Sequence, residues 1–183
     1  QEPAHSTLIP IPQEWVLPGG EVMTDTSVSA GNWDYLYEPD PKGVLDQLLI
    51  RGFDGLSASM ADVGTDDPYE DLAEAGRRYR QFAREHPSHY ALMFERSLPD
   101  YEPSLLAMGH ARATFKQLEV LVQRAMAAGS IADGDAAEVA QRLWNTCHGS
   151  VSLELRGIGF CDDPVDTSEA TAYCMLRGLR SAD

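Results

Sequence analysis

The chain has 183 residues and a formal net charge of −15, from 14 Lys and Arg residues against 29 Asp and Glu residues. This excess of acids disfavours partners that are bound through a phosphate backbone or an anionic membrane surface, because both need basic side chains. No apolar stretch approaches the roughly 18 residues of a membrane span. The three cysteines lack metal-ligand spacing, and their odd number favours a reducing cytoplasm over a disulfide framework.

Residues 1–41 differ in composition from the rest of the chain. They contain six of the 11 prolines and seven acids, and they contain no Lys or Arg. Proline removes a backbone donor and clashes with the preceding helical turn, so a regular helix cannot run through the clusters at residues 10–12 and 18–20. We predict an extended or loop-like head over residues 1–41, with room for one short helix around residues 27–37.

From residue 42 to residue 183, apolar residues recur at intervals of three and four, which is the helical period. This pattern predicts an all-α domain. The expected helices begin at Lys42, after Asp67-Pro68, at Pro87, near Pro103, after a cap at Asp133 or Asp135, and at Thr167 or Ser168. The last two helices carry apolar or small residues over much of their circumference. They are either fully buried inside one chain or packed against a second copy of themselves.

Two separated runs make the domain recognisable. Residues 79–94 read YRQFAREHPSHYALMF, and residues 143–157 read LWNTCHGSVSLELRG. Both runs resemble the ligand-binding domain of tetracycline-repressor (TetR) type regulators, in the same order and at similar spacing. The resemblance implies a homodimer joined through the last two helices as a four-helix bundle. It also implies a mostly apolar cavity for a small ligand between the central helices.

The head departs from that family. Residues 27–37 resemble its recognition helix in outline, but Asp34 and Leu36 stand where the family usually has Tyr and His. Lys, Arg and helix-end amides supply most of the affinity of a protein for the DNA backbone. A head with seven acids and no base therefore predicts a degenerate helix-turn-helix that no longer binds DNA and that serves instead as an arm or a lid over the cavity.

The candidate ligand-binding residues combine aromatic, apolar and histidine side chains from the two runs, the head and the long helix. They are Trp33, Tyr35, Tyr79, Phe82, His89, Tyr90, Met93, Phe115, Trp144, Cys147, His148 and Val151. For His148, the alternative is a structural role as a satisfied core histidine, and for Cys147 it is a core position. No His, Cys and carboxylate spacing suits a metal, so we expect neither a metal nor a cofactor.

Three functions remain open at this stage. The first is a TetR-like homodimer that binds a small, largely apolar ligand and has lost DNA binding. The second is a cofactor-independent enzyme recruited from such a regulator, a cyclase or isomerase of natural-product biosynthesis, with Asp34 and His89 as acid–base groups. The third is a transcriptional repressor with an atypical head. Charge and proline placement in residues 1–41 count against the third.

Overall fold

The computed structural model describes residues 15–16, 22–23, 41–95 and 101–180. The chain divides into two units, residues 1–39 and residues 40–183. In the first unit, β1 (Trp15–Val16) pairs antiparallel with β2 (Val22–Met23), with Trp15 opposite Met23. The helix expected around residues 27–37 lies outside the described residues, as do the candidates Trp33, Asp34 and Tyr35.

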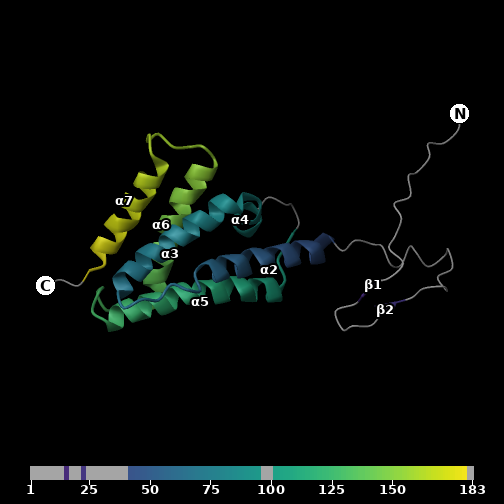
Figure 1. Ribbon diagram of the computed structural model, residues 1–183, viewed down its shortest axis with the longest axis horizontal. Helices are drawn as coiled ribbons and strands as arrows, with labels where there is room; N and C mark the ends of the chain where they lie inside the picture. The colour runs from purple at the N-terminus through teal and green to yellow at the C-terminus, as the bar shows by residue number, and fades with distance from the viewer. Residues whose placement is uncertain (1–14, 17–21, 24–40, 96–100, 181–183) are drawn as a thin grey trace, which may run out of the picture. The chain divides into compact units, whose positions relative to one another are not determined.

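The second unit is helical, which confirms the predicted all-α class (Figure 1). Its helices are α2 (Pro41–Ser59), α3 (Pro68–Glu85), α4 (Pro87–Phe94), α5 (Leu105–Ala127), α6 (Ala136–Leu155) and α7 (Pro164–Gly178). Within the described part of the chain, no helix is long and apolar enough to cross a membrane.

Three of the helices begin with the same N-terminal cap, an aspartate. The carboxylates of Asp67, Asp135 and Asp163 each accept hydrogen bonds from two backbone amides in the first turns of α3, α6 and α7. Such a cap satisfies amides that have no partner inside the helix. The predicted start of the last helix at Thr167 or Ser168 was therefore wrong, because Asp163 and Pro164 begin α7 one turn earlier.

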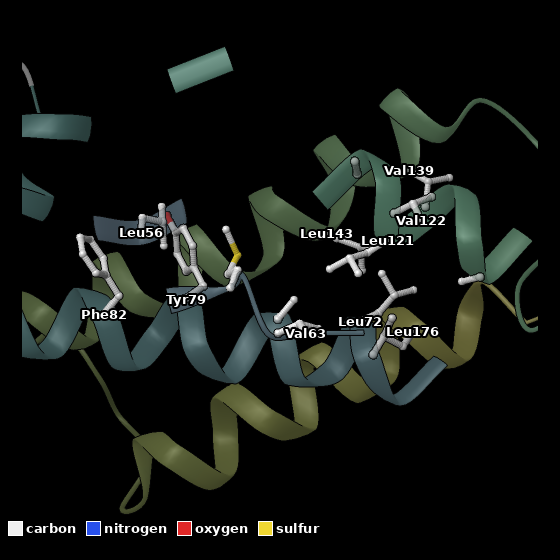
Figure 2. Packing of buried hydrophobic residues seen from close by; sticks show 14 of the residues in the cluster. Leu56, Val63, Leu72, Tyr79, Phe82, Leu121, Val122, Val139, Leu143 and Leu176 are labelled. Carbon is white, nitrogen blue, oxygen red and sulfur yellow. The ribbon is translucent and has the colours of Figure 1, made fainter. Parts of the chain in front are cut away.

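Helix α3 lies in the middle of the helical body, where it packs against α2, α4, α5, α6 and α7 (Figure 1). Its buried residues include Leu72, Ala75, Tyr79, Phe82 and Ala83, which recur at helical spacing. This stripe is the centre of the main hydrophobic core, where Leu72 of α3 joins Leu143 of α6 and Leu176 of α7 (Figure 2). Complete burial of one such side chain stabilises the fold by roughly 1.5–3 kcal/mol.

Helices α6 and α7 are only partly covered within the chain. Along α7, from Pro164 to Gly178, Leu176 is the one buried residue. Leu153 and Tyr173 are 52% and 56% exposed, although both are large and apolar. Of the two alternatives for the last two helices, complete burial inside one chain was therefore wrong.

Candidate ligand-binding cavity

A cavity of about 50 Å³ lies among α2, α3, α5, α6 and α7. Most of its lining is aliphatic or aromatic, and among the described residues no lining side chain carries a charge. The lining consists of Phe53, Leu56, Met60, Leu72, Ala75, Gly76, Tyr79, Ala111, Thr114, Phe115, Leu118, Leu143, Trp144, Thr146, Cys147, Ala172 and Leu176. Five helices and the residue after α2 thus contribute to one apolar chamber.

The volume of the cavity limits what it can hold without rearrangement. About 50 Å³ exceeds the roughly 10–15 Å³ that one water molecule needs. It is well below the roughly 300–1,000 Å³ of a site for a drug-sized ligand. A compact ligand of a few carbon atoms fits the chamber as it stands, whereas a larger ligand requires side chains of the lining to move.

Four of the candidate ligand-binding residues line this cavity: Tyr79, Phe115, Trp144 and Cys147. Five others lie outside the lining: Phe82, Tyr90, Met93, His148 and Val151. Phe82, Tyr90 and Val151 are buried in the core, Met93 packs against it, and His148 stacks on Tyr90.

His89, the acid–base candidate within the described residues, is not among the side chains that line the cavity. It lies on α4 beside His86, with the two rings 6.3 Å apart, and faces Gly52 of α2. The structure therefore separates His89 from the chamber that holds Tyr79 and Trp144.

Sequence reasoning missed the contribution of α2, which supplies Phe53 and Leu56, with Met60 directly after it. It also missed Ala111, Thr114 and Leu118 of α5, and Ala172 and Leu176 of α7. The helical period of the apolar residues was the available signal. That period identifies which face of a helix is buried. It does not show whether the buried face packs against other side chains or lines a cavity.

A polar cluster of the buried Tyr79 and Tyr90 and the half-buried Trp144 and His148 adjoins the cavity. Trp144 donates its indole N–H to the Tyr79 hydroxyl at 3.1 Å, and the Tyr79 and Tyr90 oxygens are 3.2 Å apart. His148 Nδ1 lies 2.6 Å from the Tyr90 oxygen and 3.1 Å from the Tyr79 oxygen. The cluster joins α3, α4 and α6, and its Tyr79 and Trp144 also line the chamber.

The groups of this cluster are uncharged near neutral pH. Burial lowers the pKa of His148, an effect that the nearby Glu95 opposes and Arg156 reinforces. Burial also raises the pKa of Tyr90 to about 12 and the pKa of Tyr79 further. A neutral His148 accepts at Nδ1 from Tyr90, while Tyr79 donates to Tyr90 and accepts from Trp144. This arrangement satisfies Nδ1 of His148 within the cluster.

Cys147 is the remaining ionisable group of the lining. Burial raises the pKa of its thiol to about 11, so the sulfur stays protonated and weakly nucleophilic at neutral pH. The sulfur lies opposite Gly76 of α3, where an added Cβ would stand 3.3 Å from it. Cys147 is therefore a packing residue of the cavity wall. Among the described residues, no group of His, Cys, Asp or Glu is arranged to hold a metal ion.

Comparison with known proteins decides the family. The profile of the family described as "Tetracyclin repressor-like, C-terminal domain" matches residues 72–179, more than half of the chain. The chain belongs to this family. The TetR-like match runs from Leu72 in α3 to Leu179 after α7. It leaves out α2, although α2 supplies part of the cavity lining.

Solved structures share the fold. A protein of unknown function from Rhodococcus sp. RHA1 is 25% identical, with a TM-score of 0.70 over 78% of this chain and 75% of that one. The TetR family transcriptional regulator PfmR from Thermus thermophilus is 17% identical, with a TM-score of 0.63 over 76% of this chain and 77% of its own. The putative regulatory protein SCO4313 is 23% identical, with a TM-score of 0.64 over 81% of this chain and 79% of its own.

One curated protein matches only a short stretch of this TetR-like chain. The ATP synthase gamma chain of Glaesserella parasuis serovar 5 (strain SH0165) is 41% identical over 51 residues. The match covers 28% of this chain and 15% of the length of that protein.

Proposed function

We propose that this TetR-like chain binds a small, largely apolar ligand in the cavity, forms a homodimer through α6 and α7, and has lost DNA binding. The observation that carries the ligand proposal is the uncharged chamber formed by five helices, with one polar cluster at its wall. An apolar chamber with a few polar groups is the usual design of a small-molecule site.

The chemistry of the lining favours binding over catalysis. Among the described lining residues, Tyr79 and Cys147 are the ionisable ones, and the pKa of each is raised well above neutrality. General acid–base catalysis works best with a group whose pKa lies near the working pH. Of the two acid–base candidates, His89 lies away from the lining and Asp34 lies outside the described residues.

Filling the chamber tests the ligand proposal, with toluene as a neutral apolar probe. Toluene is larger than the unfilled chamber, so side chains of the lining must move when it binds. It is expected to raise the thermal midpoint of the chain, because a ligand that binds only the folded state stabilises it. Ala111→Phe places a ring in the lining and should abolish this rise. Ala113→Phe, on the exposed side of the same helix, should leave it intact. Equal rises in the two variants would contradict binding in this cavity.

The surface of α6 and α7 supports the dimer proposal. Leu153 and Leu155 of α6 and Val165 and Tyr173 of α7 are exposed, and Phe160 in the connection between the helices is 99% exposed. Exposed large apolar side chains on two neighbouring helices mark a candidate interaction site. An isologous contact between two copies would cover them, and a stable interface of this kind buries about 800 Å² on each partner.

The double substitution Leu153→Glu and Tyr173→Glu is expected to convert a dimer into a monomer, because it places four carboxylates in the paired surface. Light scattering should give twice 20.1 kDa for the natural chain and about 20.1 kDa for the variant. Val120→Glu changes an apolar residue that is similarly exposed on α5 (45%), and it should remain dimeric. A natural chain at the mass of one copy would refute the dimer.

The loss of DNA binding rests on charge. Residues 1–41 contain seven acids and no Lys or Arg, and the whole chain carries −15. Each contact with a phosphate needs a cation or an oriented amide, so this head repels a duplex. In a gel-shift assay with duplex DNA at physiological salt, we expect no retarded band at micromolar concentrations of the protein. A saturable complex that weakens steeply with added salt would show that DNA binding is retained.

A further inference from the structure

The hydrogen-bond donors of the cavity lining are already engaged. Thr114 donates its hydroxyl hydrogen to the carbonyl oxygens of His110 at 3.0 Å and Phe53 at 3.2 Å. Thr146 donates to the carbonyl oxygen of Arg142 at 2.9 Å. The indole N–H of Trp144 and the hydroxyl hydrogen of Tyr79 are used inside the polar cluster.

The acceptors of the lining are only partly used. A hydroxyl group has one hydrogen and two lone pairs. Thr114 and Thr146 each donate the hydrogen to the backbone and accept no hydrogen bond from the residues that the structure describes. Both residues line the chamber, and their oxygens therefore retain lone pairs that no described residue uses; the Thr114 bond to Phe53 is buried, whereas the Thr146 bond is exposed. Among the described side chains of the lining, the thiol of Cys147 supplies the one uncommitted hydrogen, and a thiol is a weak donor.

We propose that the ligand of this cavity is an uncharged molecule whose polar group is a hydrogen-bond donor, such as an alcohol, and that Thr114 or Thr146 accepts that hydrogen. The proposal rests on the proposed function, since it assumes that the chamber binds a ligand. It excludes carboxylates and disfavours ketones and aldehydes.

The physical reason is the loss of hydrogen bonds to water on entry. A carboxylate would leave water for a chamber without a countercharge, which costs far more than apolar contacts return. A ketone gives up its hydrogen bonds with water and meets no free strong donor. An alcohol gives its hydrogen to a threonine oxygen and so recovers a hydrogen bond. In a chamber without acceptors the ketone would bind more tightly than the alcohol, because an alcohol loses more hydration than a ketone on leaving water.

Cyclohexanol and cyclohexanone test this inference, because they match in shape and differ in the polar group. The full chain with Trp15→Phe and Trp33→Phe retains Trp144 as its single tryptophan, which reports binding by fluorescence. We expect cyclohexanol to bind at least about fivefold more tightly than cyclohexanone, and cyclohexanecarboxylate to show no saturable binding. A ketone that binds as tightly as the alcohol overturns the inference, and binding of toluene then still supports the proposed function.

Substitution of the threonines locates the acceptor. Valine matches threonine in shape and removes the oxygen, so Thr114→Val together with Thr146→Val should reduce the preference for cyclohexanol below about twofold. Thr171→Val is the matched control, because Thr171 makes the same bond to a carbonyl one turn back and is exposed on α7. It should keep the full preference. A preference that survives in the double variant, with the fold confirmed by circular dichroism, overturns the assignment. If toluene, cyclohexanol and cyclohexanone all fail to bind, the proposed function fails together with this inference.

Discussion

Asp71→Ala is expected to lower the free energy of unfolding by about 3 kcal/mol, because it removes a buried carboxylate on which three donors depend. Asp71 is 2% exposed and accepts hydrogen bonds from the Thr65 amide at 2.9 and 3.0 Å and from the Thr65 hydroxyl at 2.9 Å. Arg124 of α5 adds an ion pair at 3.1 Å. Alanine would leave the Thr65 amide and the guanidinium without this partner. Urea unfolding followed by circular dichroism measures the loss.

Asp62→Ala is the control, because Asp62 is an exposed carboxylate in the connection between α2 and α3 that also contains Thr65. Its removal should change the free energy of unfolding by less than about 0.5 kcal/mol. Similar losses in the two variants would show that loss of a carboxylate near this connection is destabilising in general and that the contacts of Asp71 are not the cause.

The contribution of Asp71 should also depend on pH. Burial raises the pKa of this carboxyl group, but the amide and hydroxyl of Thr65 and the charge of Arg124 outweigh burial and lower it below the ordinary 3.8. A lowered pKa in the folded state gives stability that is fully present above the unfolded pKa and disappears as the pH falls through the folded pKa. The gap between the natural chain and Asp71→Ala should therefore be constant from about pH 7 to about pH 5 and shrink below about pH 4. A gap of equal size at neutral pH and at about pH 3 would contradict this account.

The contacts of Asp71 also show where the sequence stops being informative. Asp67 and Pro68 predict the start of α3 from local chemistry alone. Asp163 and Pro164 carry the same signal, but their first turn lacks an apolar stripe, so the apolar pattern placed the start too late. No local pattern connects Asp71 with Arg124, which is 53 residues away in sequence. Such a pair forms only when packing fixes α3 against α5.

The candidate site likewise contains some residues that the local sequence predicts and others that only the packing of the helices reveals. Tyr79 and Trp144 stand in the two recognisable runs, Phe115 belongs to the apolar pattern of the long helix, and all three line the cavity. Phe53 and Met60 were missed because the position of a void depends on how five helices pack. The role of Thr114 was equally out of reach, since its hydroxyl is directed by a carbonyl of α2, 61 residues earlier in the chain.

Glu154→Ala is expected to destabilise the fold by about 3 kcal/mol, since it would leave the nearly buried guanidinium of Arg80 without its carboxylate partner. Arg80 of α3 donates two hydrogen bonds to Glu154 of α6 at 2.8 and 2.7 Å, and the two side chains are only 13% and 14% exposed. Glu138→Ala is the control on the same helix. Its partner Arg142 is more than half exposed, and exposed ion pairs contribute less than about 1 kcal/mol. Denaturation with urea should separate the two variants.

A second experiment replaces both members of the Arg80–Glu154 pair. Arg80→Met together with Glu154→Leu removes both charges and keeps apolar volume. Arg84, which also pairs with Glu154 at 3.3 Å, is 53% exposed and remains hydrated, so the double variant should be more stable than Glu154→Ala alone. A double variant that is less stable would mean that the ion pair itself stabilises the fold beyond the cost of desolvating it. The pair joins the two helices that hold Tyr79 and Trp144 on the cavity wall. Glu154→Ala should therefore also weaken the binding of toluene, whereas the double variant, in which α3 and α6 stay packed, should bind it nearly as the natural chain does.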